Sequence, residues 1–271
     1  MALPRRLVFG DVAVSYDRHR PTYPQPLVDD LIDLAGIGAG DRALEVGAGT
    51  GKATALFAAR GLRVLAIEPS PSMAALARRN CAEPPGVEVV ETDFERWDPR
   101  GQTFALIYSA QAWHWIDPDV GYRRVREALA PDGVLGVFWN RPAWGRSELR
   151  DALIAAYEVT VPDLEPDGPL HPANQAPDGD DGWPAAIDTA DGLHAPELRR
   201  YPWSIDYTGD EYAGLLSTLS EVRLLEPARR QALLSAVRAA IETHGGTLQM
   251  PMVTRLCLAR RGRPAAPRAR A

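Results

Sequence analysis

A short glycine-rich stretch decides the fold, and it reads Leu44-Glu45-Val46-Gly47-Ala48-Gly49-Thr50-Gly51-Lys52. The apolar run that leads into it, residues 42–46, is typical of a strand, and residues 52–60 after it have a helical pattern. Glycines between a strand and a helix let the backbone turn tightly and let a ligand approach the main chain closely. The stretch therefore predicts a ligand-binding turn at the end of the first strand of an α/β sheet.

Apolar runs alternate with helical patterns on either side of this turn, which favours β–α–β units and a mainly parallel sheet. Further strands are expected at residues 63–67, 87–91, 104–108 and 134–139. Helices are expected after Ser70-Pro71 and Asp117-Pro118, because a capping residue followed by proline is a start signal. Later in the chain, alternating apolar residues predict a strand over 201–207, and a final strand is expected over 247–259. The helices between them start at the Thr208/Glu211 capping box and after Pro227.

Length and composition limit the class of protein. The chain has 271 residues, 45% of them apolar and 24% charged, which suits one large α/β domain with an inserted cap. Its net charge of −6 argues against strong sequence-independent binding to nucleic acid. No apolar run approaches a membrane span, and Asp11 cuts short the N-terminal apolar stretch that a signal peptide would need. With two cysteines, Cys81 and Cys257, a disulfide scaffold is excluded and a cytoplasmic location is expected.

The second half of the chain contains an acidic segment. Residues 151–198 hold 11 acidic residues, seven prolines and no lysine or arginine, so we expect a short helix near 148–158 followed by a loop-rich insertion. The run Asp178-Gly179-Asp180-Asp181-Gly182 does not fit a calcium-binding loop, and no metal is expected. The expected organisation is an N-terminal lid or arm with the first helix (1–36), a cofactor-binding core (37–140), an acidic cap insertion (141–200), the C-terminal part of the core sheet (201–260) and a disordered tail (261–271).

Three ligand classes compete for the glycine turn. A nucleoside-triphosphate loop needs glycine five residues before Gly51 and a hydroxyl after Lys52, and Val46 and Ala53 fail both tests. A dinucleotide fingerprint needs its third glycine one residue later than Gly51, which weakens NAD but leaves it open. The third class is S-adenosylmethionine, for which the spacing of an acid and alternate glycines is suitable.

Two more acids follow the next two strands and favour the third class. Glu68 ends the second strand, where a carboxylate can accept hydrogen bonds from both hydroxyls of a ribose. Asp93 and Phe94 follow the third strand, where they could accept from the adenine amino group and pack on the ring. Glu45 could face a cationic amino-acid moiety. Acids at three successive strand ends lie along one edge of a parallel sheet, where ligands of open α/β folds bind.

With these motifs the sequence resembles the class I S-adenosylmethionine-dependent methyltransferases, in particular the small-molecule branch of type-11 and trans-aconitate methyltransferases. The resemblance also rests on Ile67-Glu68-Pro69-Ser70, on residues 109–115 and on residues 129–135. It implies a Rossmann-like, doubly wound sheet of seven strands, six parallel and one antiparallel near the C-terminus. The cofactor-binding residues it implies are Tyr16, Arg20, Glu45, Gly47, Ala48, Gly49, Thr50, Gly51, Glu68, Pro69, Met73, Asp93, Phe94, Ser109, Ala110 and Gln111.

Methyl transfer chiefly requires that a nucleophile be oriented, and some acceptors also need a proton removed. His114, between Trp113 and Trp115 after the fourth strand, is the candidate base; alternatively the three residues merely wall the pocket. In related enzymes the N-terminal segment folds over the cofactor as a lid, which would bring Tyr16 and Arg20 to the site; a surface arm is equally open.

The expected function is methyl transfer from S-adenosylmethionine to a small molecule, with O-methylation favoured over N- or C-methylation and a setting in secondary metabolism. The alternatives are an NAD(P)-dependent oxidoreductase and a methyltransferase fold that binds the cofactor without transferring methyl. Neither a nucleic acid nor a membrane is expected as a partner.

Overall fold

The computed structural model describes residues 13–83, 85–165, 168, 170–174 and 192–262. The first twelve residues of the expected lid, the acidic run 178–182 and residues 263–271 of the tail lie outside this part. Across the described residues, no helix has the length and apolar character needed to cross a membrane.

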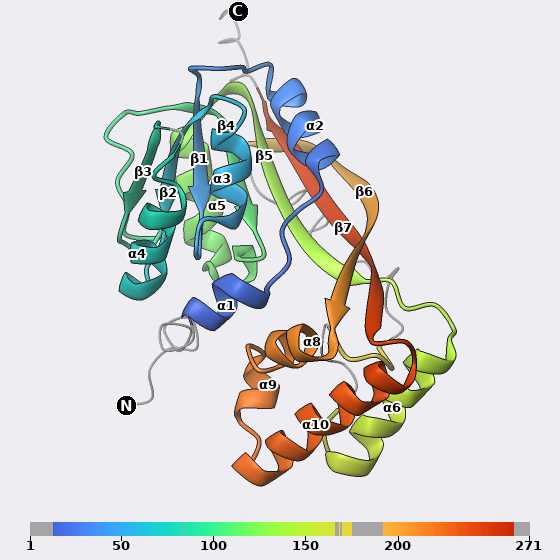
Figure 1. Cartoon of the computed structure of the whole chain (residues 1–271). Helices are drawn as coiled ribbons and strands as arrows, with labels where there is room; N and C mark the ends of the chain where they lie inside the picture. The colour runs from blue at the N-terminus through green and yellow to red at the C-terminus, as the bar shows by residue number, and fades with distance from the viewer. Residues whose placement is uncertain (1–12, 84, 166–167, 169, 175–191, 263–271) are drawn as a thin grey trace, which may run out of the picture.

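A seven-stranded sheet forms the centre of the fold (Figure 1), in the order β3-β2-β1-β4-β5-β7-β6. The strands are β1 (Arg42–Val46), β2 (Arg63–Ile67), β3 (Val87–Val90), β4 (Phe104–Ala110), β5 (Leu129–Pro142), β6 (Leu193–Thr208) and β7 (Thr247–Arg261). Strand β7 runs antiparallel to both of its neighbours, and the other pairings are parallel. The predicted sheet of six parallel strands and one antiparallel strand is confirmed.

Helices cover both faces of the sheet. Alternate strand residues point to opposite faces, so Ala43 joins one apolar cluster and Leu44 the other. The cluster around Ala43 also holds side chains of α2 (Gln25–Ala35) and α3 (Lys52–Ala58), whereas α5 (Pro118–Ala128) packs on the opposite face. Helix α4 (Pro71–Asn80) lies beside α3 and β3, and the short α1 (Ala13–His19) contacts α4.

Strands β5, β6 and β7 are long and extend beyond the parallel part of the sheet to a second group of helices (Figure 1). This helical lobe consists of α6 (Glu148–Thr160), α8 (Gly209–Leu216), α9 (Ser220–Arg223) and α10 (Pro227–Thr243). It has its own apolar cluster, in which Leu153, Leu216, Leu233 and Val237 are fully buried. The insertion thus contributes α6 to a packed lobe, and the helices of the expected 201–260 segment belong to that lobe while its strands join the sheet.

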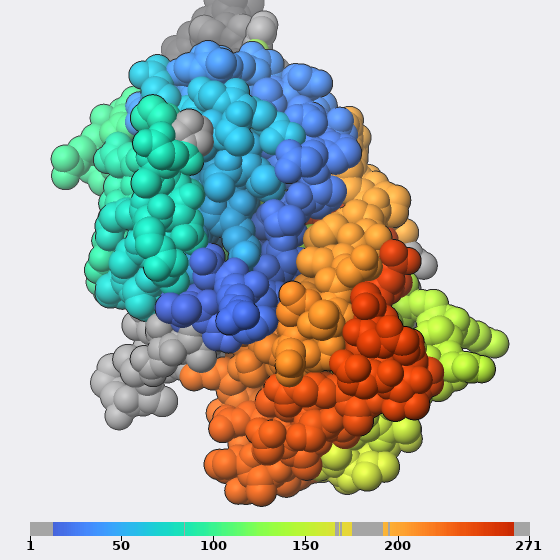
Figure 2. Space-filling view, in the orientation of Figure 1, coloured from blue at the N-terminus to red at the C-terminus, as the bar shows by residue number. Residues whose placement is uncertain are grey.

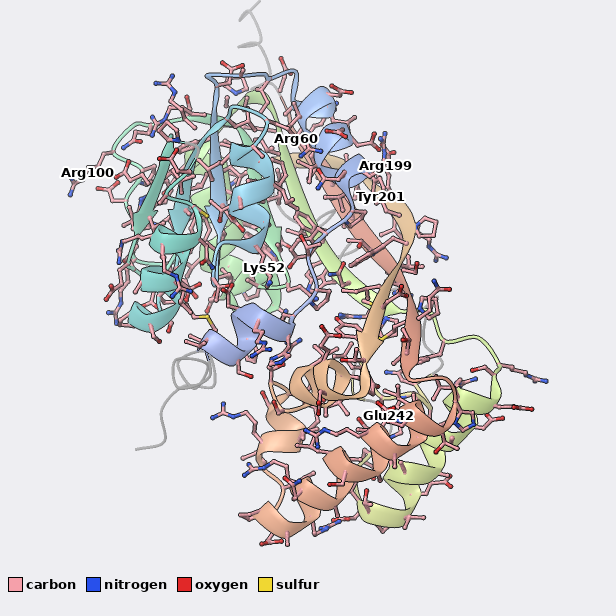
Figure 3. The ribbon with its side chains drawn as sticks, viewed as in Figure 1. Lys52, Arg60, Arg100, Arg199, Tyr201 and Glu242 are labelled. Carbon is pink, nitrogen blue, oxygen red and sulfur yellow. The ribbon has the colours of Figure 1, made fainter. Side chains whose placement is uncertain are left out.

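Hydrogen bonds tie the far edge of the sheet to the core. The Asp30 carboxylate on α2 accepts hydrogen bonds from the Tyr201 hydroxyl at 2.7 Å and from the Arg199 guanidinium at 3.1 Å. Figure 3 shows Arg199 and Tyr201 reaching from β6 toward α2. Strand β6 begins at Leu193, well before the expected Tyr201, because its first residues pair with the end of β7 across an irregularity between His194 and Glu197.

The helix starts agree with the sequence in most places. Asp117 accepts from the amides of residues 119 and 120, and the Thr208/Glu211 capping box is formed. Ser70 is an exception: it occupies the N-cap position of α4, but its side chain makes no capping hydrogen bond. Its backbone N–H donates instead to Glu68, a residue of the site described below.

A buried polar chain links the long strands. The Trp203 indole N–H donates to the Thr254 hydroxyl at 2.9 Å, that hydroxyl donates to Asn140 Oδ1 at 2.6 Å, and the Asn140 amide donates to the carbonyl of Thr22 at 2.9 Å. Thr254 and Asn140 are almost completely buried. The chain therefore joins β6, β7 and β5 to the segment that follows α1.

Replacement of Thr254 by valine removes one acceptor and one donor from this chain at nearly constant volume. Buried polar groups left without partners cost about 1–3 kcal/mol, so we expect Thr254→Val to lower the free energy of unfolding by that amount in urea titrations. Thr254→Ser keeps the hydroxyl and is the control. Equal losses in the two variants would show that the methyl group, rather than the polar chain, stabilises the junction.

Candidate active site

A cavity of about 480 Å³ lies at the carboxyl ends of the parallel strands. Its walls include the ends of β1 and β4, which are neighbours at the point where the strand order reverses, the usual ligand site of an open α/β sheet. Two further walls come from the segment around α1 and from the start of α9. In Figure 2 the chain around α1 lies between the core and the helical lobe.

The glycine turn has a fixed shape that only glycine permits at two positions. Gly47 has φ 74°, and a Cβ there would lie 2.4 Å from the Cβ of Ala112. The backbone N–H groups of Gly47 and Ala48 both donate to the carbonyl of Ile67, at 2.9 and 3.0 Å. Gly51 has φ 86° and faces α4, where a Cβ would lie 2.7 Å from Cys81 Sγ. Gly51 therefore serves helix packing and does not line the cavity.

Glu68 connects the two turns that border the cavity. Its Oε2 accepts from the Gly49 N–H and its Oε1 from the Ser70 N–H, both at 2.8 Å. The side chain is only 6% exposed and lines the cavity. Burial raises its pKa, and the two backbone N–H groups oppose that shift because they stabilise the ionised carboxylate.

Glu45 is fully buried at the inner wall of the cavity. Its Oε2 accepts from the Thr54 hydroxyl at 2.6 Å and from the Tyr108 hydroxyl at 3.0 Å, whereas Oε1 has no hydrogen-bond partner among the described residues. Burial raises the pKa of Glu45 to about 8, although the two hydroxyl donors lower it and the nearby Glu68 raises it further. Burial therefore favours the protonated form of the Glu45 carboxyl.

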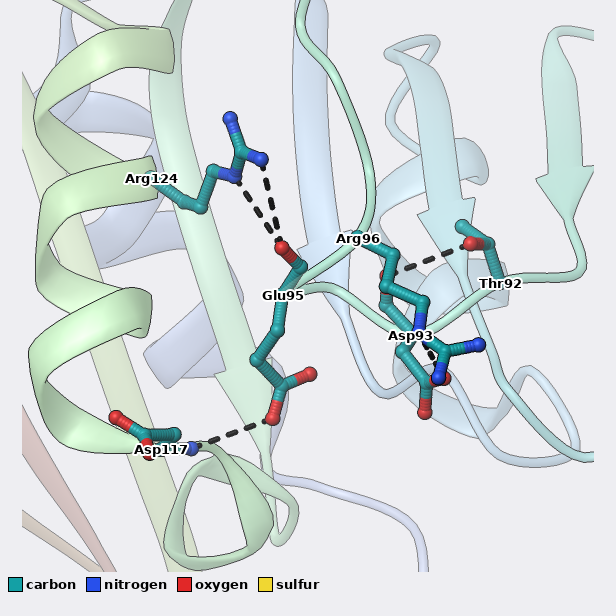
Figure 4. Close-up of polar contacts among 6 residues, drawn as sticks. All are labelled: Thr92, Asp93, Glu95, Arg96, Asp117 and Arg124. Atoms are coloured by element: carbon teal, nitrogen blue, oxygen red, sulfur yellow. Dashed lines mark hydrogen bonds and ion pairs between the residues drawn. The ribbon is translucent and has the colours of Figure 1, made fainter.

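The segment after β3 brings Asp93 and Phe94 to the cavity wall. Figure 4 shows how it is held: the Glu95 carbonyl accepts from the Arg124 guanidinium at 3.4 Å, and Glu95 Oε1 accepts from the Asp117 N–H at 3.3 Å. Asp93 lies 3.8 Å from the exposed Arg96. The Phe94 ring is nearly buried and stacks on Trp97 with ring centroids 6.0 Å apart, so its orientation is fixed by the core.

The end of β4 supplies part of the wall opposite β1. Ala110 and Gln111 line the cavity, and Gln111 has φ 61°, a strained value for a residue with a side chain. Ser109 does not reach the cavity, because it is fully buried and its hydroxyl donates to the carbonyl of Val46 at 2.8 Å. Its role is to join β4 to β1 beside the site.

The N-terminal helix is fixed to the helical lobe. Arg20 donates to the Thr218 hydroxyl at 2.9 Å and to the Thr218 carbonyl at 3.4 Å, and its guanidinium lies 5.0 Å from the centre of the Tyr16 ring. A Cβ on Gly214 of α8 would lie 2.4 Å from the His19 ring. Tyr16 and Arg20 both line the cavity, and Arg20 is hydrogen-bonded to the lobe. That this segment acts as a lid stays a prediction.

His114 lies in a short 3₁₀ helix, Trp113–Trp115, on the other side of the cavity. Its Nδ1 accepts from the Trp139 indole N–H at 3.4 Å. Desolvation lowers the pKa of His114 to about 4, with a further contribution from the positive charge of Arg141. The site therefore disfavours the charged imidazolium form of His114.

Fifteen of the residues that the sequence predicted line one cavity: Tyr16, Arg20, Glu45, Gly47, Ala48, Gly49, Thr50, Glu68, Pro69, Met73, Asp93, Phe94, Ala110, Gln111 and His114. The cavity is also lined by residues that the sequence pattern did not indicate, among them Lys52, Trp139, Arg141, Leu219, Ser220 and Glu221. Lys52 directly follows the glycine turn, and Trp139 and Arg141 lie toward the end of β5, so the strand-end argument could have found them. Residues 219–221 reach the cavity only through the packing of the lobe. The described residues contain no group of three or more histidine, cysteine, aspartate or glutamate side chains placed to hold a metal ion.

Comparison with known proteins agrees with this architecture. A family model described as a methyltransferase domain matches residues 43–133. This part of the chain, from β1 to the first residues of β5, is thus similar to a methyltransferase domain. An uncharacterized methyltransferase of Mycobacterium tuberculosis is 39% identical over 135 residues, which are 49% of this chain and 52% of that protein. The matched region thus spans about half the length of this curated relative.

Solved structures share the fold. A protein of Anaeromyxobacter dehalogenans assigned as a type II methyltransferase has a TM-score of 0.61 and 20% identity, over 90% of this chain and 97% of its own. The phosphoethanolamine N-methyltransferase 2 of Haemonchus contortus, solved with S-adenosyl-L-methionine, has a TM-score of 0.55 and 14% identity, over 97% and 61%. At these identities the likeness concerns the fold of the methyltransferase domain.

The buried acid Glu45 gives a prediction for stability. Its pKa is about 8 in the folded chain against 4.5 in the unfolded chain, so unfolding between these values releases a proton. The contribution of protonated Glu45 to the free energy of unfolding is fully present below pH 4.5. It decreases as the pH rises to 8, by about 1.4 kcal/mol per pH unit at most. Because glutamine cannot ionise, Glu45→Gln should gain stability over the wild type across this range, measured by urea unfolding at several pH values. Glu88→Gln on the exposed surface is the control; parallel stability–pH curves for wild type and Glu45→Gln would contradict the buried protonated acid.

Proposed function

We propose that this protein transfers a methyl group from S-adenosylmethionine to a small-molecule acceptor, with an oxygen as the favoured nucleophile. The main support for the proposal is the set of acids at the ends of β1, β2 and β3. They line the same cavity as the glycine turn, in the part of the chain that matches a methyltransferase domain. The dinucleotide alternative has no comparable support. Its motif needs the third glycine one position later in the sequence, whereas here that glycine is Gly51, which packs against α4.

The chemistry of the cavity suits this cofactor. Glu68 keeps further acceptor capacity on oxygens that backbone amides already hold in place, which suits two ribose hydroxyls. Asp93 and Phe94 would hold the adenine. Two buried polar atoms at the inner wall, Glu45 Oε1 and Thr50 Oγ1, have no partner among the described residues. Buried polar atoms rarely remain unpaired, and an ammonium and a carboxylate of an amino-acid moiety would pair them.

The remaining wall would receive the acceptor. When bound, S-adenosylmethionine supplies a methyl group already activated by a sulfonium, so the protein must mainly orient the nucleophile and exclude water. His114, Trp115, Trp139 and Arg141 form this wall beyond the cofactor residues. A cavity of about 480 Å³ falls within the range of small-molecule sites, which supports a small acceptor. The trans-aconitate-like branch, the setting in secondary metabolism and a cytoplasmic location remain predictions.

The direct test is a transfer assay with methyl-labelled S-adenosylmethionine and a panel of carboxylic acids, phenols and amines. We expect label in at least one oxygen acceptor, at a rate well above the same mixture without protein. Label in amines only would overturn the preference for oxygen. Cofactor binding without transfer to any member of a broad panel would favour a binding protein over an enzyme.

Removal of the Glu68 carboxylate should weaken the cofactor site. Glu68→Ala loses the ribose hydrogen bonds and releases the N–H groups of Gly49 and Ser70. At ~1.5–3 kcal/mol for each charge-assisted bond with partial compensation, affinity for S-adenosylhomocysteine should fall by about 2–4 kcal/mol in calorimetric titration.

Glu88→Ala is the matched control, because it removes the same charge from an exposed position on the neighbouring strand β3. Glu68→Gln retains one acceptor oxygen and should fall between Glu68→Ala and the wild type. Unchanged affinity in a folded Glu68→Ala protein would exclude Glu68 from the cofactor site.

A further inference from the structure

His114 has a defined tautomer in this structure. Its Nδ1 lies 3.4 Å from the Nε1 of Trp139, and an indole N–H can only donate. Nδ1 must therefore carry no proton. A neutral imidazole has one proton on its two nitrogens, so that proton is on Nε2. Trp139 is 2% exposed and held in the core cluster on that face of the sheet, so the donor is fixed in place.

The other nitrogen remains available to a ligand. His114 lines the cavity and is exposed to it, while its neighbours Trp113 and Trp139 are buried. No described residue accepts a hydrogen bond from its Nε2. A nitrogen that already carries a proton cannot take another from an acceptor unless the ring first changes tautomer and loses the Trp139 hydrogen bond.

We propose that His114 is a positioning donor and that its Nε2–H holds an oxygen of the acceptor, rather than serving as the general base. This inference rests on the proposed function. It follows that His114 removes no proton from the attacking atom, which suits an acceptor that is already ionised, such as a carboxylate. In the transfer, the acceptor's lone pair forms the new bond to the methyl carbon, the carbon–sulfur pair stays on sulfur, and charge balances without a proton moving to the protein.

The electrostatic surroundings agree with a neutral ring. Burial is the larger cause of the lowered pKa of His114, and Arg141 on β5 adds to it. The other charged side chains that line the cavity are Glu45, Lys52, Glu68, Asp93, Arg20 after α1, Glu95 after β3 and Glu221 on α9. Arg20 donates a hydrogen bond to the Thr218 hydroxyl, and Glu95 accepts one from the backbone N–H of Asp117. Formation of an imidazolium here would place a second positive charge near Arg141 in a partly desolvated site, which disfavours base catalysis by His114.

Nitrogen NMR of the histidine rings tests the proposal on the full chain without any ligand. Long-range proton–nitrogen spectra of the ¹⁵N-labelled protein distinguish the two tautomers, and His114→Gln assigns the signal. We expect His114 to show the Nε2–H form and no titration between pH 5.5 and 8. His244 is an internal control of the opposite kind, because its Nδ1 lies 2.7 Å from the Ala240 carbonyl and must donate to it.

Trp139→Phe removes the donor and keeps an aromatic ring, so it should give His114 a mixture of tautomers. If that variant does not fold, the wild-type spectrum alone decides. An Nδ1–H form of His114, or a titration near pH 6.5, would overturn the proposal. The spectrum needs no cofactor. An Nδ1–H form of His114 in a protein that binds S-adenosylhomocysteine would therefore contradict only the role of His114. Absence of S-adenosylhomocysteine binding would contradict the proposed function.

An acceptor found in the labelled assay gives a second readout. His114→Phe should lower kcat/KM roughly three- to tenfold, as expected for the loss of one hydrogen bond. His114→Gln, whose side-chain amide can donate, should recover part of that loss. For the wild type, kcat/KM should be level between pH 6 and 8; a rise following a group with a pKa near 6.5 that disappears in His114→Gln would restore the general base.

Discussion

The bridge that Glu68 makes between two backbone turns is the interaction on which the rest of the site depends. Strands β1 and β2 pair in parallel register, with Val46 opposite Ile67, so their turns emerge side by side. Glu68 accepts one N–H from each turn, from Gly49 and from Ser70. The backbone of the glycine turn is thereby held in place by a side chain from the neighbouring turn. The same carboxylate lines the cavity, so the group that shapes the site is also placed to bind a ligand there.

The second constraint is the closure of the cavity by elements distant in sequence. Strands β5, β6 and β7 carry the chain out of the parallel core to the helical lobe, and the lobe returns residues 219–221 to the cavity. Arg20 joins the N-terminal helix to Thr218 beside them. Most of the residues proposed to bind the cofactor therefore lie on the core. Tyr16, Arg20 and residues 219–221 reach the cavity through the packing of the α1 segment and the lobe. Acceptor choice can change in such a fold without change to the cofactor residues.

The sequence predicted the parts of the fold that local pattern controls. The strand-end acids Glu45, Glu68 and Asp93 were found because parallel strands end at the same edge, and the Thr208 and Asp117 caps follow short-range rules. Long-range pairing was not readable. The Tyr108 hydroxyl donates to Glu45, 63 residues earlier in the sequence, and the Ser109 hydroxyl donates to the Val46 carbonyl. The position of Gly51 against Cys81, and that of Trp139 beside His114, likewise depend on how helices and strands pack. Gly51 and Ser109, which were predicted to bind the cofactor, instead make packing and backbone contacts. The contact with Trp139 favours a hydrogen-bond donor over a base at His114.

We propose above all that these strand ends hold S-adenosylmethionine and not a dinucleotide. It is tested most directly by parallel calorimetric titrations of the full chain with S-adenosylhomocysteine, NAD and NADP at neutral pH. We expect micromolar, one-to-one binding of S-adenosylhomocysteine and no measurable heat from either dinucleotide. Binding of NAD or NADP without S-adenosylhomocysteine would contradict it.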